Sequence, residues 1–225
     1  MLTLGLETSL IPGSIALCDN GVCLEERTLQ TDRRHAETLV PEIQGLLAEH
    51  GYHLRDCQAV AVSEGPGSFT GLRIGVTCAK TLAYATGVPL VAIPTLAAVA
   101  HNVVDDVQRL FVVSDAQRKQ LFCAEFGRDD NGIWESVAAI TIVDADEFAS
   151  QCTPHDHVTG PGLIKFAELF RDRCTILPPA TWMPHAAVIA RFGEQEIRAK
   201  RTADIWALQP FYLRKSAAEE RFPGK

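Results

Sequence analysis

The chain repeats one arrangement of predicted strands, once at its start and again about 110 residues later. The first copy is an apolar run that ends at Glu7, followed by two alternating segments joined by the tripeptide Asp-Asn-Gly at 19–21. The second copy is an apolar run that ends at Asp115, followed by two strands around Asp-Asn-Gly at 130–132. Asn-Gly is a common hairpin turn, so the tripeptide alone could recur by chance. The shared order of elements favours two related α/β lobes.

Hydrophobic periodicity places further elements after each copy. Pro41 lies inside the first helical pattern, which predicts a kink or a later start. We expect an N-terminal lobe over 1–105, a C-terminal lobe over 106–202, and a C-terminal segment over 203–225 with a loose tail from residue 216. The predicted helices cover 32–50, 70–86, 96–104, 144–152, 163–171 and 184–201, and the remaining strands cover 59–63, 90–93, 120–126, 134–142, 157–159 and 175–177.

Composition limits the class of protein. Charged residues make up 22% of the chain and hydrophobic residues 47%, which is typical of a globular protein with a real core. There is no apolar run of about 18 residues and no basic start typical of a signal peptide, so we expect a cytoplasmic protein with no membrane contact. The net charge of −7 predicts poor binding of nucleic acid by this chain unaided. Seven cysteines without a Cys-x-x-Cys pair indicate reduced thiols.

A glycine-rich loop over 65–71 follows a predicted strand and opens a predicted helix. In that position backbone N–H groups and a helix N-terminus can receive an anion. The loop has no lysine of a Walker A motif, and its spacing G-x-G-x-x-x-G misses the dinucleotide fingerprint. It could therefore also be a tight connection that binds nothing. The candidate nucleotide or phosphate residues are Glu7, Thr8, Ser9, Gly65, Gly67 and Ser68.

The helix predicted over 70–86 is unusually apolar. Apolar and small residues fill roughly 200° of its circumference, whereas a helix that covers one side of a sheet needs little more than ~100°. Gly71, Gly75, Ala79 and Ala83 recur every fourth residue and would let another backbone approach closely. Burial on two sides explains both features. The second cover is either the neighbouring helix of the same chain or another subunit.

Other candidate sites are weaker. Glu7 and Asp115 hold matching places in the two lobes and could bind a metal-nucleotide across a cleft, or each could simply cap a loop. His155 and His157 could chelate a metal, but no third ligand is evident. His35 fits a packed or solvated histidine better than a base. The chain has no G-x-S-x-G or His-Glu-x-x-His motif, so we expect no catalytic residues and no metal site.

Four segments resemble the bacterial TsaB (YeaZ) family of the tRNA threonylcarbamoyladenosine machinery. They are Leu-Gly-Leu-Glu-Thr-Ser at 4–9, Arg-His-Ala-Glu at 34–37, Gly-Pro-Gly-Ser-Phe-Thr-Gly-Leu-Arg-Ile-Gly at 65–75, and Pro-Phe-Tyr-Leu-Arg at 210–214. The resemblance covers almost the whole chain, and the segment at 65–75 is the most specific part of it. The family more often has Asp where this chain has Glu7.

The resemblance implies an actin-like, sugar-kinase-like (ASKHA) fold of two duplicated lobes, each with a mixed sheet flanked by helices. It implies a non-catalytic scaffold for transfer of a threonylcarbamoyl group to N6 of adenosine 37 in tRNAs that read ANN codons. The catalytic relative, TsaD, binds a metal through histidines, but the matching stretch at 93–100 has none and His101 stands alone. The resemblance further implies a TsaE-like ATPase partner, tRNA contact through the complex, and a homodimer when the chain is alone. We expect no tightly bound cofactor, although ATP or ADP could lie at the interface of the complex.

The same resemblance places the TsaD interface on the first two helices. A bulky charged residue at Gly75 or Ala79 is then predicted to abolish partner binding. The expected interface residues are His35, Ala36, Leu39, Ile43, Phe69, Gly71, Leu72, Arg73, Gly75, Val76, Ala79 and Lys80.

Two alternative functions remain open on the sequence. One is an ATP-dependent phosphotransferase that uses Glu7, Asp115 and the glycine loop. The other is a glycoprotease-like peptidase, which would need a nucleophile or a metal-bound water.

Overall fold

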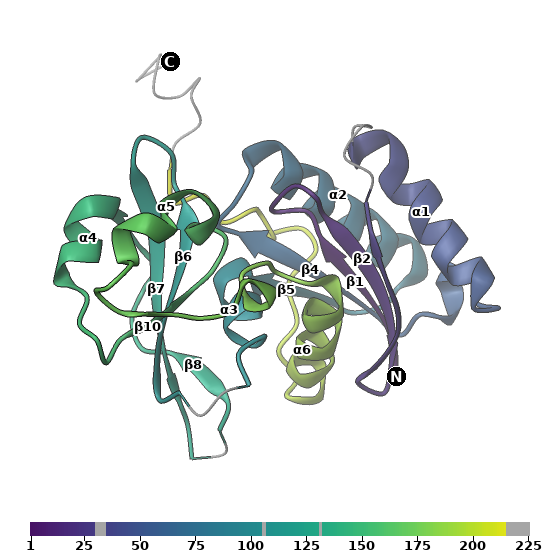
Figure 1. The fold of residues 1–225 in the computed structure, drawn as a ribbon. Coiled ribbons are helices and arrows are strands. Elements are labelled where there is room, and N and C mark those ends of the chain that lie inside the picture. Colours follow the sequence, from purple (N-terminus) through teal and green to yellow (C-terminus); the bar gives the residue numbers. More distant parts are fainter. Residues whose placement is uncertain (30–34, 105–106, 131, 215–225) are drawn as a thin grey trace.

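A computed structural model describes residues 1–29, 35–104, 107–130 and 132–214 and shows two β-sheets side by side, each flanked by helices (Figure 1). The predicted helix start at 32–34, the Asn131 of the second turn and the tail at 216–225 lie outside the described residues. Within the described part, no helix is long and apolar enough to cross a membrane.

The two sheets have the same topology. The first has the order β3-β2-β1-β4-β5 and the second β8-β7-β6-β10-β11, with β9 also paired to β7. In each sheet the first three strands are antiparallel and the last two join in parallel. This match confirms the predicted duplication and the actin-like architecture. The strands are β1 (Leu2–Glu7), β2 (Ser14–Asp19), β3 (Val22–Thr28), β4 (Ala59–Gly65), β5 (Leu90–Pro94), β6 (Arg109–Asp115), β7 (Gln120–Arg128), β8 (Trp134–Ser136), β9 (Thr141–Asp144), β10 (His157–Thr159) and β11 (Thr175–Ile176).

The helices lie close to the ranges that the periodicity predicted. Among the strands, one prediction differs from the structure. The predicted strand at 134–142 is two strands, because the chain turns after Ser136, whose hydroxyl donates to the carbonyl of Ala138 at 2.8 Å. Pro41 lies within α1 without ending it. The helices are α1 (His35–Glu49), α2 (Phe69–Thr86), α3 (Thr95–Ala100), α4 (Ala145–Gln151), α5 (Leu163–Phe170) and α6 (Ala186–Arg198), with 3-10 turns at Leu54–Asp56 and Pro179–Thr181.

Each sheet is covered on both faces. The apolar side chains of α1 and α2 form one core with β1, β2 and β4. Those of α4 and α5 pack with β6, β7 and β10, while α3 contributes to a core on the other face of the second sheet. The helix α3 therefore lies between the two lobes (Figure 1).

Helix α6 packs on the first sheet, although its residues fall in the range expected for the C-terminal lobe. Val188 and Ile189 share a core with strands β4 and β5. The approach is close: a Cβ on Gly5 would lie 2.2 Å from the carbonyl oxygen of Ala186, and one on Gly193 would lie 2.5 Å from the Cβ of Ala61. Small residues on both surfaces make this contact possible, so the expected boundary of 106–202 does not follow the packing.

Candidate functional site

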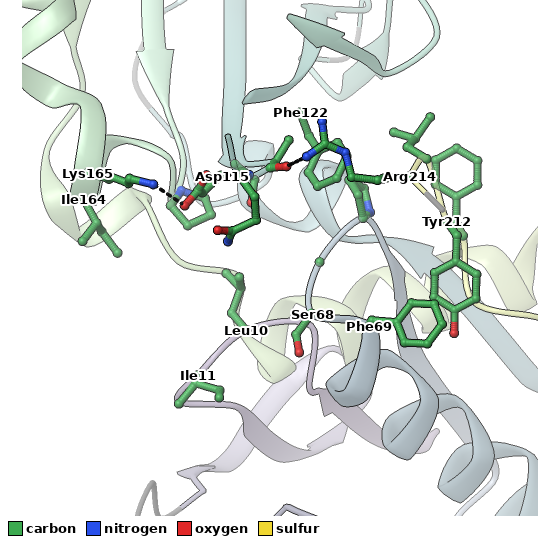
Figure 2. A pocket seen from close by; sticks show the side chains of 18 of the residues that line it. Leu10, Ile11, Ser68, Phe69, Asp115, Phe122, Ile164, Lys165, Tyr212 and Arg214 are labelled. Carbon is green, nitrogen blue, oxygen red and sulfur yellow. Dashed lines mark hydrogen bonds and ion pairs between the residues drawn. The ribbon is translucent and has the colours of Figure 1, made fainter. Parts of the chain in front are cut away.

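The two lobes enclose a cavity of about 860 Å³ (Figure 2). Its walls come from the β1–β2 loop, the glycine loop before α2, the β6–β7 hairpin, α5 and the C-terminal segment. The lining side chains are mostly apolar, with cationic groups at the edge; those that define it best are Leu10, Phe69, Phe122, Ile164, Lys165 and Arg214. The glycine loop follows β4 and opens α2, as the sequence predicted, and it lies at the edge of this cavity.

Glu7 is fully buried at the end of β1 and binds its own loop. Its Oε1 accepts hydrogen bonds from the backbone N–H of Ser9, at 2.6 Å, and from the Ser9 hydroxyl. Burial raises the pKa of this carboxyl, and the hydrogen bonds from Ser9 partly offset the rise. The side chain therefore takes the place that an external anion would need in this loop.

The glycine loop also uses its polar groups internally. The Ser68 N–H donates to the carbonyl of Ser9 at 2.7 Å, and the Ser68 hydroxyl accepts from the Gly71 N–H at 3.2 Å. A Cβ on Gly67 would lie 2.5 Å from the Ser9 carbonyl oxygen, so glycine is needed for contact between the two loops. The candidate set from Glu7 to Ser68 is brought together, but its loops pack on each other.

The two carboxylates expected across the cleft do not meet there. Asp115 lines the cavity, whereas Glu7 is buried behind its loop and is not part of the lining. Asp115 accepts from the Gln117 N–H at 2.7 Å and pairs with Lys165 at 3.3 Å (Figure 2). Both carboxyl groups stabilise local structure.

The described residues contain no group of three or more His, Cys, Asp or Glu side chains that could hold a metal ion. His101 packs its ring on Phe192 and bonds through Nδ1 to the carbonyl oxygen of Ala97. Burial lowers the pKa of His101, which is the direction expected for a neutral packed imidazole.

The small-residue stripe of α2 faces into the same chain. A Cβ on Gly71 would lie 2.0 Å from the Thr8 carbonyl oxygen, and one on Gly75 would lie 2.0 Å from Thr8 Oγ1. Ala79 and Ala83 are likewise buried. A second cover of α2 is therefore the loop after β1, which belongs to the same chain but is not the neighbouring helix that the sequence suggested. Gly75 and Ala79 are both buried within the chain itself, so their predicted contact with a partner stays a prediction.

Four of the other nine expected interface residues are also interior. Leu39, Ile43 and Val76 are buried in the first core, and Leu72 is buried as well. Phe69, Arg73 and Lys80 retain surface, and the side chains of His35 and Ala36 are not described. The exposed strip of α1 and α2, which we call the outer α1–α2 face, consists instead of Glu37, Val40, Gln44, Ala48, Arg73, Thr77, Thr81 and Tyr84.

The C-terminal segment contributes to the site in a way the sequence reasoning missed. Residues 211–214 of its closing Pro-Phe-Tyr-Leu-Arg motif line the cavity beside Phe69 (Figure 2). In the sequence this motif is identified only by its resemblance to a family, because no hydrophobic periodicity marks an irregular segment of this kind.

Comparisons with known proteins agree on one family. The family model for tRNA N6-adenosine threonylcarbamoyltransferase, TsaD, matches residues 24–170, more than half of the chain. The chain is 29% identical to the tRNA threonylcarbamoyladenosine biosynthesis protein TsaB of Escherichia coli, and the match covers all of both sequences. It is 27% identical to TsaB of Bacillus subtilis over 99% of this chain and 98% of that one.

A solved structure gives the same result. The crystal structure of a Pseudomonas aeruginosa protein described as similar to peptidase YeaZ superimposes with a TM-score of 0.81 at 25% identity. The match covers 95% of this chain and 99% of that one.

Proposed function

Because the chain belongs to the TsaD family of tRNA N6-adenosine threonylcarbamoyltransferases and is of the TsaB (YeaZ) type, we propose that it is a non-catalytic subunit of tRNA threonylcarbamoyladenosine biosynthesis. In this role it binds a TsaD-like catalytic paralogue, which carries the chemistry of transfer to N6 of adenosine 37. It has no activity of its own on tRNA or on nucleotide.

One observation carries the non-catalytic part of this proposal: Glu7 occupies hydrogen-bond donors of the loop that follows β1. The Ser9 N–H and hydroxyl both donate hydrogen bonds to that carboxylate, and the Ser68 N–H donates to the Ser9 carbonyl. A phosphate in the same place would have to break these bonds and would meet a carboxyl group instead of donors. This arrangement argues against the phosphotransferase alternative.

The peptidase alternative lacks support from the thiols as well. Burial raises the pKa of Cys57 and of Cys78 to about 11, which disfavours the nucleophilic thiolate. The pKa of Cys152 is lowered, but mainly by a hydrogen bond with the Cys174 thiol and not by a catalytic base.

The outer α1–α2 face is the docking surface that we propose for the paralogue. It exposes apolar surface on both helices, with Val40 at 44% and Tyr84 at 68% exposure. In the absence of the paralogue, a second copy of this chain would pair through the same face. A TsaE-like ATPase and tRNA join through the complex, and any ATP or ADP binds at the junction between subunits.

Reconstitution tests the proposal. Purified chain, TsaD-like paralogue, ATPase subunit, threonylcarbamoyl donor and unmodified tRNA are combined, and modified adenosine is measured by mass spectrometry of nucleosides. We expect product from the complete mixture, a large loss when this chain is left out, and none from this chain with tRNA and donor alone. Product in the last reaction would overturn the proposal.

A further inference from the structure

The end of the chain crosses from one lobe to the other at the mouth of the cavity. Up to Phe211 the segment lies on the first lobe, where three hydrogen bonds hold it. The Ala203 N–H donates to the Leu90 carbonyl at 2.8 Å, and Lys80 Nζ donates to the Leu208 carbonyl at 2.8 Å. The Phe211 N–H donates to the Glu64 carbonyl at 2.7 Å. From Leu213 onward it lies on the second lobe, where Leu213 packs against the apolar core.

Arg214 anchors the far end. Its Nη1 donates to the carbonyl oxygen of Ala116 and its Nη2 to Oε1 of Gln120, at the two sides of the β6–β7 hairpin (Figure 2 shows Arg214 beside this hairpin). The planar guanidinium can hold two separate acceptors at once, which a lysine ammonium on a flexible stem does less well. Neither contact is to a carboxylate, and within the described part of the chain Arg214 forms no ion pair, so these two bonds fix geometry.

Tyr212 links the crossing to α2. Its ring stacks on Phe69, the first residue of α2, with centroids 4.5 Å apart, and its hydroxyl accepts from Arg73 Nε at 3.2 Å. Arg73 in turn lies over the Phe69 ring at 4.0 Å from its centroid. The first turn of α2 is thus held by the segment that also grips the second lobe.

The glycine loop is shaped to admit this segment. Gly65 has φ +123°, and a Cβ there would lie 2.7 Å from the Phe211 carbonyl oxygen. A side chain at this position would push the crossing away from β4. The glycine that looked like part of a phosphate loop therefore serves the contact with residue 211.

We propose that residues 203–214 form an interlobe clamp, in which Tyr212 and Arg214 are positioning residues that hold the first turn of α2 in the orientation needed to dock the catalytic paralogue. The docking part of this inference rests on the proposed function. The mechanical part concerns the chain alone, because it rests on the contacts that this segment makes with both lobes beside the cavity.

Hydrogen exchange of the isolated chain, read by mass spectrometry, tests the mechanical part without any partner. Arg214→Ala and Arg214→Lys should raise amide exchange at least about tenfold both in the hairpin at 115–120 and in the loop and helix start at 65–73. Tyr212→Ala should do so at 65–73, whereas Tyr212→Phe, which keeps the stacked ring, should stay close to wild type. Arg171→Ala removes an exposed pair with Glu168 on α5 and is the control. A rise confined to 115–120 in the Arg214 variants would overturn the clamp.

Titration of the TsaD-like paralogue tests the docking part. Arg214→Ala should weaken the Kd several-fold although Arg214 does not lie on the outer α1–α2 face, and turnover at saturating chain should return to the wild-type value. An unchanged Kd with the exchange effect present would reject the positioning role. Failure of the wild-type chain to bind the paralogue would reject the proposed function and leave the exchange result standing.

Discussion

Thr8 explains the glycines of α2 more simply than a partner does. Its carbonyl oxygen and hydroxyl lie where side chains at 71 and 75 would be, and its hydroxyl also donates to the Gly71 carbonyl at 2.8 Å. A helical wheel shows how much of a helix is apolar, but it cannot show that a loop residue 63 positions away fills the groove. The sequence correctly predicted burial on two sides and could not identify the second cover.

The first prediction concerns this contact. Gly75→Ala should lower the free energy of unfolding by about 1–3 kcal/mol, because the new methyl group must displace Thr8. Urea denaturation measures the loss. Gly45→Ala in α1 is the matched control, since its Cβ would approach nothing closer than 3.4 Å; it should be neutral or stabilising by about 0.5–1 kcal/mol. Equal stability of the two variants would mean that Gly75 is not covered from within.

Glu7 gives a second prediction at this scale. Its folded-state pKa is raised above the ordinary 4.5, so the native state holds this proton more tightly than the unfolded chain. The resulting contribution favours folding at low pH and is lost as pH rises through the folded-state pKa. Glu7→Gln keeps an acceptor for Ser9 without the buried charge, so it should remove this slope and be at least as stable as wild type at pH 8.

Unfolding free energies of the two proteins at pH 5 and pH 8 provide the measurement. Calorimetric titration with Mg-ATP then distinguishes the roles of Glu7: we expect no binding to either protein. Magnesium-dependent binding by wild type that disappears in Glu7→Gln would support the phosphotransferase instead.

At the scale of elements, α6 shows how two distant parts of the chain are joined. The Ala186 N–H at its start donates to the Ser14 hydroxyl at 3.0 Å and to Glu26 Oε1 at 2.7 Å, so side chains of β2 and β3 cap the helix. Its helical periodicity was readable in the sequence. Its place on the first sheet could not be predicted, because small residues such as Gly193 permit close packing but do not identify the surface against which they pack.

This cap carries the third prediction. The carboxylate of Glu26 also pairs with His185 at 3.3 Å, and this pair raises the pKa of His185. Burial acts to raise the pKa of Glu26, but hydrogen bonds from His185, Ser14 and the Ala186 backbone outweigh burial and lower it. The His185 contribution is present below its unfolded pKa near 6.5 and is lost as pH rises through the folded value. The Glu26 contribution is present above its unfolded pKa near 4.5 and is lost as pH falls through the folded value.

Glu26→Gln should therefore lower the free energy of unfolding by about 1 kcal/mol near pH 6 and by less above pH 8. The effect is small because His185 is partly exposed and solvent partly screens the pair. Glu135→Gln on exposed β8 is the control and should change stability by less than about 0.5 kcal/mol at either pH. Thermal or urea unfolding at the two pH values measures both. A loss that is equal at pH 6 and pH 8 would exclude the His185 pair as its source.

At the scale of the whole molecule, the duplication was fully readable from the sequence, because strand order and turns are local signals repeated in each half. The cleft between the copies was expected as well. What sequence patterns could not supply was the use of that cleft: Glu7 filling its own loop, and residues 203–214 crossing at its mouth. Both depend on contacts between segments far apart in the chain. The result is a cleft between the lobes whose loops are used for internal contacts.

Sedimentation velocity of the chain mixed with its TsaD-like paralogue tests the central claim most directly. The variant Val40→Glu/Thr77→Glu places two charges on the outer α1–α2 face at exposed positions, so its fold should be kept, and Val137→Glu places one on an equally exposed site of the second lobe. We predict a complex for wild type and for Val137→Glu, and separate species for the double variant. A double variant that still sediments with the paralogue at wild-type affinity would contradict docking through this face.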